Sequence, residues 1–418
     1  MAPVGGPARA PAEPPAARAP ALRPEEIAYG MPIGLEHRPP LPVGDGSGSP
    51  RQALEEVLAG ALARPPCLVS FSGGRDSSAL LAVATAVARR HGLALPVPAT
   101  MVFPGSPASE EGRWQTAVLD HLALPDRILI PVGDELDAVG PVASAALTRH
   151  GLLWPFNAHF HVPVFEHAAG GTVVTGFGGD ELALSSSSAR AERVLARRLH
   201  PGWTDVLRVG LALSPRPVRT AVHWHRARAD LADRPWVTTR GRRLLSRQLA
   251  IADGQIPLGW EAVLRRIVWR SRYFTVCTGS LAALGAAVDV AVVHPFVDPQ
   301  VLDALARAGG FAGLGNRTAL TDRLFGDVLP AEVVRRQSKA SFTDPLWTAT
   351  AREFAATWSG GGIDTTLVDA DALRRVWAGD QPNLLTITLL QQAWLHDHPG
   401  SAIAGRGAGT AGPIGTRS

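Results

Sequence analysis

The chain has 418 residues, a length that fits two or three domains, or one large α/β domain with additions. Its net charge of +4 is small for this length, and basic residues are not clustered with stacking aromatic side chains, so we expect no nucleic-acid partner. The sequence has no apolar run near the roughly 20 residues of a membrane span, no apolar signal-peptide core, and only two cysteines. We therefore expect a cytoplasmic protein without a membrane partner or a disulfide framework.

The first regular pattern follows a long irregular segment. Residues 1–50 are rich in Pro, Ala and Gly, and we expect them to be flexible, with a short ordered piece around Ile27–Leu35. Apolar residues then recur at helical spacing from Arg51 to Ala63. The apolar run Cys67–Phe71 is typical of a buried β-strand. The ordered part is thus predicted to begin with a helix that leads into a strand.

A loop with two adjacent glycines follows this strand and opens a second helix. It reads Ser72-Gly73-Gly74-Arg75-Asp76-Ser77, and Ser78 comes next. Glycine lets the backbone approach a ligand closely, and loop amides beside a helix N-terminus favour an anion. An aspartate beside that anion indicates an accompanying cation such as Mg²⁺, so a nucleotide triphosphate is the natural ligand. The Lys-Ser/Thr pair of the Walker loop is missing, and the segment instead resembles the PP-loop of the ATP pyrophosphatases, which cleave ATP between the α and β phosphates. A plain Gly-Gly turn is the alternative.

Strands and helices alternate after this loop. We expect strands at Val97–Phe103 and Arg127–Pro131, and between them a helix that opens with Glu110 and Glu111. This order predicts an α/β fold, a Rossmann-like parallel sheet with helices on both faces. Ligands of such sheets bind at the carboxyl ends of the strands, where the Ser72 loop falls.

A second glycine-rich loop occurs about a hundred residues after the first. An expected helix at Asp134–His150 precedes it, and Thr172–Thr175 is predicted to be a strand. The strand leads into Gly176-Phe177-Gly178-Gly179-Asp180-Glu181. Because this loop also follows a strand and ends in acids, it repeats the chemistry of the first loop.

The remainder of the chain is predicted to be mostly helical. Residues 185–272 are rich in Arg and are predicted to form a helical insertion, whose charged face is either solvated or a surface for an acidic peptide or partner protein. We expect one domain at residues 51–398, which includes this insertion, and a flexible tail at residues 399–418.

Two further motifs stand out in this helical part: His294-Pro295-Phe296-Val297-Asp298 and Arg336-Gln337-Ser338-Lys339-Ala340-Ser341-Phe342. Lys339 is the only lysine of the sequence. Since Arg is so abundant here, a single Lys indicates a site that the planar guanidinium does not fill.

Together, the four motifs resemble the synthetase domain of the class B asparagine synthetases. That superfamily includes the β-lactam synthetases and the macrolactam-forming cyclases of lasso peptide pathways. The resemblance covers about residues 51–395. It implies a carbon–nitrogen ligase that uses ATP and Mg²⁺ to activate a carboxylate as an acyl-adenylate, which an amine or ammonia then attacks to form an amide.

The resemblance also implies roles for single residues. Asp76 and Asp180 would hold Mg²⁺, and Lys339 would neutralise the charge that builds up on the phosphates during adenylation, so these three would be catalytic. The pyrophosphate would lie against Ser72, Gly73, Gly74, Ser77 and Ser78. The adenine would contact Val102 and Gly176, and the nucleotide site would also include Gly178, Gly179 and Glu181.

The sequence departs from the family pattern around the amine. Relatives that use glutamine carry a nucleophilic Cys after the initiator Met, where this sequence has Ala2, so we expect no glutamine hydrolysis unless a separate chain supplies it. The β-lactam synthetases use a catalytic Tyr, and at the second loop this chain offers Phe177. Asparagine synthetases carry a Glu where we align Ala291, and the nearby Asp289 is out of phase. The group that deprotonates the amine is therefore unassigned.

Two histidine motifs remain. His159-Phe160-His161 is reminiscent of the actinobacterial peptide cyclases, and we interpret it as a packing segment, with catalysis by either histidine as the minority alternative. His223 and His225 are possible metal ligands, but no third ligand has a useful spacing.

Three functions are compatible with the sequence. The first is an AMP-forming amide ligase of natural-product or peptide (macrolactam) biosynthesis, with a separate glutaminase or peptide-recognition protein as a possible partner; asparagine synthesis from aspartate, with ammonia or a separate glutaminase chain, is its variant. The second is a non-catalytic nucleotide-binding scaffold. The third is another PP-loop chemistry such as tRNA thiolation, for which the added Cys or RNA-binding elements are not visible. Retention of Asp76, Asp180 and Lys339 favours the ligase.

Overall fold

The structure is a computed structural model of the chain. It describes residues 19–44, 48–104, 111–124, 126–183, 189–197, 200, 202–336, 344–380 and 382–399. Within these ranges, no helix has the length and apolar character needed to cross a membrane.

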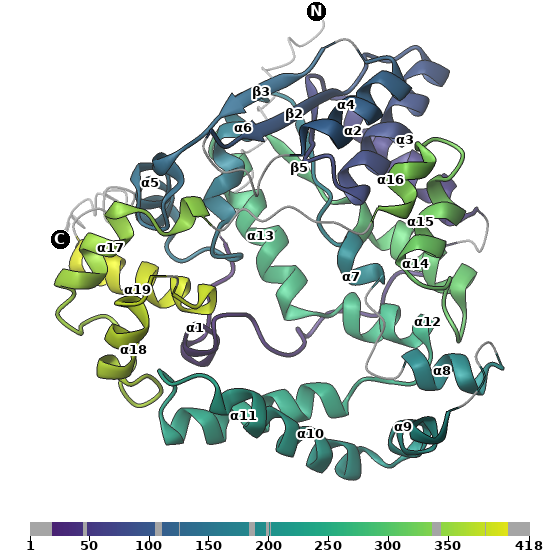
Figure 1. The fold of residues 1–418 in the computed structure, drawn as a ribbon. Coiled ribbons are helices and arrows are strands. Elements are labelled where there is room, and N and C mark those ends of the chain that lie inside the picture. Colours follow the sequence, from purple (N-terminus) through teal and green to yellow (C-terminus); the bar gives the residue numbers. More distant parts are fainter. Residues whose placement is uncertain are drawn as a thin grey trace, which may run out of the picture.

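A five-stranded parallel sheet forms the centre of the fold (Figure 1). In chain order its strands are β1 (Cys67–Ser70), β2 (Val97–Val102), β3 (Ile128–Pro131), β4 (Thr172–Val174) and β5 (Ala291–Val293). In space the order is β3-β2-β1-β4-β5, so the direction of winding reverses between β1 and β4. Cys67 pairs with Thr172 and Val69 with Val174, and the two strands therefore end side by side. Such a switch point is where ligands of open α/β sheets bind.

Helices cover both faces of the sheet, as predicted. Side chains alternate along β1, so that Leu68 packs in one apolar layer and Cys67 and Val69 pack in the other. The first layer includes residues of α6 (Val162–Glu166), α13 (Arg272–Ala286) and α19 (Ile387–Asp397). The second includes residues of α2 (Pro50–Leu62), α3 (Arg75–His91), α4 (Gly112–Leu122) and α14 (Pro299–Gly309). The predicted α/β class is confirmed.

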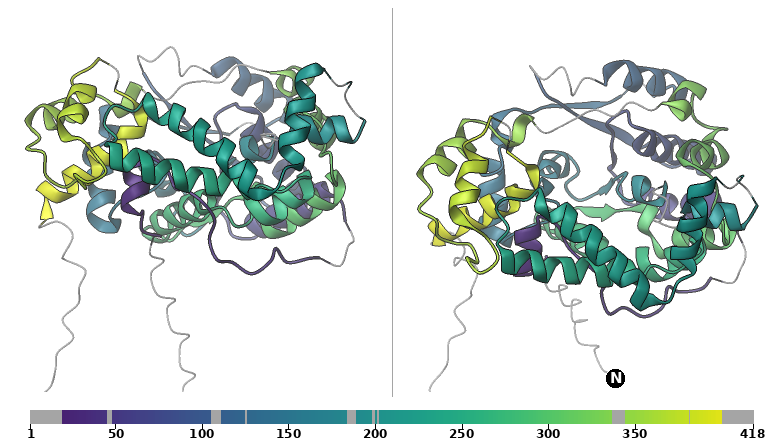
Figure 2. Two further views of the ribbon diagram at one scale, coloured as in Figure 1. Left: turned by 90° about the horizontal axis from the view of Figure 1, so that it is seen from below. Right: turned by 60° about the horizontal axis from the view of Figure 1, so that its bottom comes forward.

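The helical insertion and the helical C-terminal part are also present. The insertion consists of α8 (Ala189–Leu195), α9 (Trp203–Leu213), α10 (Arg216–Ala232), α11 (Thr239–Gly254), α12 (Trp260–Val263) and the π-helical turn η4 (Leu264–Val268). Within it, α10 and α11 are long helices that pack against each other (Figure 2). The C-terminal part contains α15 (Arg317–Phe325), α16 (Ala331–Arg335), α17 (Ala349–Thr357) and α18 (Ala370–Trp377) before α19. Helices α17–α19 gather at one end of the molecule, beside α5 (Pro141–His150) and α1 (Pro24–Tyr29) (Figure 1).

One predicted helix is interrupted in the structure. The segment Asp134–His150 forms a 3₁₀ turn, η2 (Asp134–Leu136), and then α5, which begins at Pro141. Proline suits the first turn of a helix because its missing N–H would have no partner there, but it does not continue a helix. The buried carboxylate of Asp137 fills the gap, since it accepts hydrogen bonds from the backbone N–H groups of Val139 and Thr348 (3.0 and 2.8 Å).

More of the N-terminal segment is packed than the short ordered piece predicted around Ile27–Leu35, since α1 (Pro24–Tyr29) precedes and overlaps it. Residues 1–18 and 45–47 lie outside the described part. Glu26 of α1 is 1% exposed and pairs with Arg272 of α13, whose Nη2 donates to Glu26 Oε2 at 2.8 Å. The backbone N–H of Ile33 donates to the same carboxylate at 3.1 Å. Since an unpaired buried charge is costly, this ion pair fixes the segment on α13 in spite of its Pro- and Ala-rich composition.

We predict that Glu26→Ala destabilises the protein by about 2–4 kcal/mol, because it leaves Arg272 buried without its main partner. Denaturant-induced unfolding measures this loss. The control is Glu25→Ala on the same helix, where the half-buried side chain accepts one hydrogen bond, from Gln248 (3.1 Å), and a loss below about 1 kcal/mol is expected. Equal losses for the two variants would contradict the anchoring role of Glu26.

Candidate active site

A cleft with a volume of about 1070 Å³ lies at the carboxyl ends of β1 and β4. Both glycine-rich loops line it, together with side chains from other elements of the chain. The residues from the loops are Ser72, Gly74, Arg75, Asp76, Ser77, Thr175, Gly176, Phe177 and Asp180, and the others include Glu111, His161, Arg317 and Arg336. The parallel sheet thus brings together two loops that lie about a hundred residues apart in sequence.

The two loops touch each other, and glycine makes this contact possible. A Cβ atom on Gly179 would lie 2.4 Å from Asp76 Cγ, which no side chain tolerates. A Cβ atom on Gly176 would lie 3.2 Å from the backbone nitrogen of Ser77. Asp76 and Asp180 therefore face one space, although each belongs to a different loop.

The first loop is folded around the N-terminus of α3. The backbone N–H of Gly74 donates to Ser72 Oγ (3.2 Å), and that of Ser72 donates to Ser77 Oγ (3.3 Å). Gly74 is the N-cap residue of this 17-residue helix and offers no side-chain cap, so the first helical N–H groups point toward the cleft. The arrangement suits an anion. Ser78 does not line the cleft, since it is fully buried.

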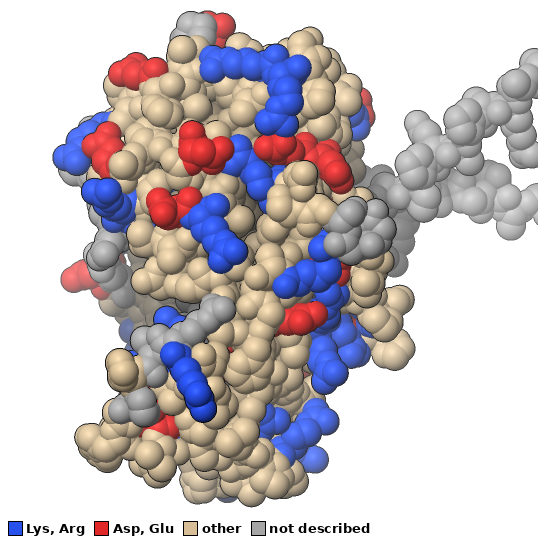
Figure 3. All heavy atoms as spheres, turned by 90° about the vertical axis from the view of Figure 1, so that its right-hand side faces the viewer, with Lys and Arg blue, Asp and Glu red and all other residues tan. Residues whose placement is uncertain are grey.

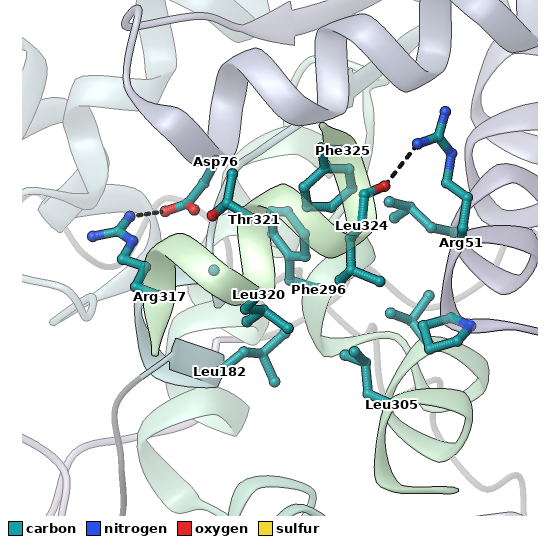
Figure 4. Close-up of a pocket in the computed structure, with 14 residues that line it drawn as sticks. Arg51, Asp76, Leu182, Phe296, Leu305, Arg317, Leu320, Thr321, Leu324 and Phe325 are labelled. Atoms are coloured by element: carbon teal, nitrogen blue, oxygen red, sulfur yellow. Dashed lines mark hydrogen bonds and ion pairs between the residues drawn. The ribbon is translucent and has the colours of Figure 1, made fainter. Parts of the chain in front are cut away.

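One arginine joins the two aspartates. Arg317, the first residue of α15, places Nη2 at 2.6 Å from Asp76 Oδ2 and pairs through Nη1 with Asp180. Figure 4 shows the Asp76–Arg317 pair at the edge of a mainly apolar pocket of about 490 Å³. The guanidinium lies between the carboxylates, where a cation is expected. Two such carboxylates fit Mg²⁺, whose remaining ligands would be phosphate oxygens and water.

A second ion pair lies on the other side of the first loop. Arg336 is 5% exposed, pairs with Glu111, and donates through Nη1 to the carbonyl oxygen of Gly73 at 2.8 Å. Its guanidinium also lies 4.9 Å from the ring centre of Trp114. Arg336 brings the fourth motif to the cleft, while Lys339 belongs to residues 337–343, which lie outside the described part.

One histidine, His161, lines the cleft, and a second, His294, packs beside Phe177. The His294 Nδ1 atom lies 2.6 Å from Thr175 Oγ1, and its ring packs edge-on against Phe177 at 5.7 Å. Burial lowers the pKa of His161 to about 4 and that of His294 to about 3, and the proximity of His161 lowers the latter further. Both imidazoles are therefore neutral at pH 7. Their remaining shielded atoms, His161 Nδ1 and His294 Nε2, have no hydrogen-bond partner.

A second cavity, of about 610 Å³, adjoins the cleft and shares Ser70, Ser72 and His161 with it. Its floor is apolar and lies on the ends of β1 and β2. The predicted adenine contact Val102 does not line either space, and its side chain is 39% exposed. Met101 and Phe103 line the cavity instead, because successive side chains of a strand point to opposite faces.

The other predicted positions are distributed as follows. Gly178 has φ +95° and packs against Val297, and the backbone of Glu181 lies in the short helix α7 (Gly179–Ala183), whereas its side chain lies outside the described part. Ala291 begins β5, and Asp289 pairs with Arg64 at 2.8 Å. Since β5 is parallel to the other strands, both lie at the sheet edge opposite the cleft.

The structure shows different surroundings for the other histidines that the sequence singled out. The ring of His159 donates through Nε2–H to the carbonyl oxygen of Leu136 at 2.9 Å, and burial lowers its pKa to about 4, so this residue is structural. His223 Nδ1 lies 3.5 Å from an Asp253 carboxylate oxygen. Among the residues that the structure describes, no group of three or more His, Cys, Asp and Glu side chains is arranged to hold a metal ion, so the His223–His225 pair gains no third ligand.

Sequence reasoning missed three polar side chains of the cleft. Arg317 and Arg336 were not singled out as cleft residues, and Glu111 was expected only to start a helix. Arg317 pairs with Asp76 and Asp180, and Arg336 pairs with Glu111; the partners lie more than 130 positions apart in each case. No local sequence pattern therefore predicts these ion pairs. The one available signal was the N-cap residue Asn316, which accepts a hydrogen bond from the N–H of Ala319 (2.9 Å) and thereby fixes the start of α15 beside Asp76.

Fold and site together define a nucleotide-dependent α/β ligase whose site is built from two glycine-rich loops. The family model described as asparagine synthase matches residues 50–396, and the chain therefore belongs to the asparagine synthase family. It is accordingly an ATP-dependent carbon–nitrogen ligase. No curated protein matches the sequence.

We predict that the Arg317→Gln variant binds Mg²⁺ at least several-fold more tightly than wild type, so that Mg²⁺ stabilises it at lower concentrations. The variant removes the cation that now lies between Asp76 and Asp180, so the metal no longer competes with a guanidinium. The shift of the unfolding temperature with Mg²⁺ concentration measures the change. Arg323→Gln, an exposed position of the same helix, is the matched control and is expected to leave the shift as in wild type. A weaker shift in Arg317→Gln than in wild type would contradict this reading of the two aspartates.

Proposed function

We propose that this chain adenylates a carboxylate in the cleft and transfers the acyl group to an amine, in the biosynthesis of a peptide or another natural product. The observation that carries this proposal is the meeting of Asp76 and Asp180 across the two glycine-rich loops, next to an apolar cavity. ATP needs all three features: amide donors for its phosphates, carboxylates for Mg²⁺ and an apolar slot for its base.

The geometry supports one placement of ATP. The apolar cavity beside Met101 and Phe103 takes the adenine, and the phosphates extend past Ser72 to the N-terminus of α3. Asp76 and Asp180 would hold Mg²⁺ beside the phosphates, where the metal would supply positive charge to the phosphate oxygens. Arg317, released from the aspartates, then faces the phosphates together with Arg75. We expect Lys339 to join them from the adjoining motif.

The lining of the cleft favours an acyl substrate larger than free aspartate. Pro155, Phe177 and Leu281 add apolar surface beside the charged residues. A peptide carboxylate uses such a wall better than a small dicarboxylic acid. Synthesis of asparagine from aspartate is the second candidate, because that reaction gives the matching family its name.

We predict that one class of carboxylate supports ATP–pyrophosphate exchange, with AMP and pyrophosphate as products. The panel holds aspartate, short acidic peptides and small acids. Lys339→Met removes the charge expected at the phosphates and lowers exchange at least about 100-fold, and Lys339→Arg also lowers it, because the guanidinium has another shape. Thermal unfolding of each variant is the control for folding. Formation of ADP and phosphate would refute adenylation, and efficient asparagine formation from aspartate and ammonium would establish the second candidate.

The helical insertion offers a surface for a partner. Residues 189–254 contain 14 Arg and five acidic residues, a net charge of +9, whereas the whole chain carries +4. On α9, the side chains of Trp203, Val206 and Leu207 are 82%, 71% and 71% exposed. In Figure 3, which views the molecule from the side of α8 and α9, the lower half of the face carries more Arg than acidic side chains. Exposed apolar side chains within a basic surface mark an interaction site.

A groove of about 680 Å³ between α9 and the α10–α11 pair supports a more specific proposal. Leu207, Leu211 and Ile256 provide apolar lining, and Arg208, Arg219 and Arg226 provide positive charge, with Asp253 as the one acidic lining residue. By charge complementarity, we propose that this groove binds an acidic peptide segment with apolar anchor residues, contributed by a partner protein.

We predict that a labelled peptide of about 20 residues, rich in Leu and Glu, binds the protein, and that its Lys-containing counterpart does not. The double variant Arg219→Glu and Arg226→Glu weakens binding at least about tenfold, because the groove loses its positive charge. Arg243→Glu, an exposed position of α11 that does not line the groove, makes a smaller change of the same sign. Fluorescence anisotropy measures the affinities. Binding to anionic lipid vesicles in place of the peptide would overturn the proposed partner.

A further inference from the structure

The cleft contains one imidazole, that of His161, which has no role in the proposed binding of ATP and Mg²⁺. His161 is the last residue of the 3₁₀ helix η3 (Ala158–His161) and lies where the cleft meets the adenine cavity, since it lines both. Its ring stacks on Phe165 with a centroid distance of 5.8 Å and an interplanar angle of 26°, which holds the ring in place. Its Nδ1 atom is shielded and has no partner, and its other nitrogen, Nε2, is the one accessible from the cleft.

A second imidazole lies close behind it. His294 is near enough to His161 for one ring to disfavour the charge of the other. Thr175, which follows β4, fixes His294 through the 2.6 Å contact with Nδ1 and also accepts the backbone N–H of Phe177 (3.4 Å). His294 Nε2 is shielded and lacks a partner, as is His161 Nδ1. Buried nitrogens without a partner are uncommon in folded proteins, and here two of them belong to neighbouring imidazoles.

We infer that His161 is the general base of the amide-forming step and that His294, held by Thr175, is a positioning residue behind it. The inference rests on the proposed function, because it requires an acyl-adenylate in the cleft. It supplies the group that Phe177 and Ala291 do not provide. Phe177 has no titratable atom, and Ala291 lies at the opposite edge of the sheet.

The step balances without a further reactant. The amine nitrogen attacks the acyl carbon, the new C–N bond forms, and the bond from that carbon to the phosphate oxygen of AMP breaks, so AMP leaves with the electron pair. The nitrogen must also lose one proton, and His161 Nε2 accepts it. His161 is placed for this transfer because it borders both the nucleotide cavity and the cleft, and the acyl carbon is joined to the nucleotide.

The charges around the ring support this role. Both imidazoles are neutral, which is the form that accepts a proton. The charged groups that line the cleft are Arg75, Asp76, Glu111, Asp180, Arg317 and Arg336. Arg317 pairs with Asp76 and Asp180, and Arg336 pairs with Glu111, whereas Arg75 donates to the hydroxyl of Thr318 (3.3 Å). His159, the other titratable group of η3, is neutral as well. The bound adenylate adds negative charge, which favours the imidazolium and thus strengthens the base when it is needed.

The test separates adenylation from amide formation. His161→Gln keeps a polar atom near the position of Nε2 but does not take up a proton at neutral pH. With the carboxylate that supports pyrophosphate exchange in wild type, two nucleophiles are compared. Ammonium must lose one proton before its nitrogen can attack and a second one afterwards, whereas hydroxylamine is largely uncharged at neutral pH and loses only the second, so it depends less on a base. We expect exchange within about threefold of wild type, a loss of about 10²–10⁴-fold in amide formation from ammonium, and a loss below about tenfold in hydroxamate formation.

Two further variants test the arrangement. His159→Gln is the matched control on the same 3₁₀ helix. Residue 159 does not line the cleft, and the glutamine side chain can still donate to the carbonyl oxygen of Leu136. We expect this variant to make the amide product at a rate near that of wild type. Thr175→Val lowers amide formation, and Thr175→Ser restores it, because only a hydroxyl orients His294. Imidazole added to His161→Gly restores part of the lost rate.

Distinct results would overturn the inference and the proposed function. Undiminished amide formation from ammonium in His161→Gln excludes His161 as the base. An equal loss of exchange and amide formation assigns His161 to the nucleotide site or to folding, and so also overturns the inference. Absence of acid-dependent exchange in wild type instead removes the proposed function itself.

Discussion

The contact between the two glycine-rich loops is the constraint on which the site depends. Parallel pairing of β1 and β4 brings the loops to one edge, but only the missing side chain of Gly179 lets Asp76 come into contact with the second loop. The close approach places two carboxylates in one space, which is unfavourable by itself. Arg317 offsets this repulsion by pairing with both. The site therefore depends on three features together: the sheet topology, the glycine at position 179 and the arginine at position 317.

Acidic and basic side chains of the cleft neutralise one another. Arg317 neutralises Asp76 and Asp180, and Arg336 neutralises Glu111 while it binds the carbonyl oxygen of Gly73. A bound nucleotide and metal would thus replace the partners of side chains that are already charged. This replacement costs less free energy than burying new charges. Both arginines come from the C-terminal half of the chain, from α15 and the end of α16. The first glycine-rich loop lies early in the sequence, but its ion pairs form only when the C-terminal half packs against it.

The parts of the fold that local patterns determine were predicted from sequence. Strand and helix periodicity placed β1 to β4 and the two loops within a residue or two, because each depends on a short window. The break at Pro141, the packed segment around Glu26 and the bridge through Arg317 were not found. Those features depend on pairs such as Glu26–Arg272, which lie 246 positions apart. The sequence singled out Val102, whereas its neighbours Met101 and Phe103 line the cavity, because the strand pattern did not show which residues face this side of the sheet.

The cleft divides into a half that follows the family pattern and a half that departs from it. The half formed by the two glycine-rich loops carries Ser72, Gly74, Asp76, Ser77 and Asp180, which the family pattern led us to expect there. The half beyond Phe177 is walled by aromatic and apolar side chains, and Tyr273 of α13 stacks on Phe177 at 6.0 Å. The direction of β5 places Asp289 and Ala291 away from this half, since Asp289 precedes the strand and Ala291 is its first residue. A proton acceptor for the amine must therefore come from a different element than in asparagine synthetases. We expect the elements that wall this half, η3 and α13, to decide which amine and which acid the enzyme joins.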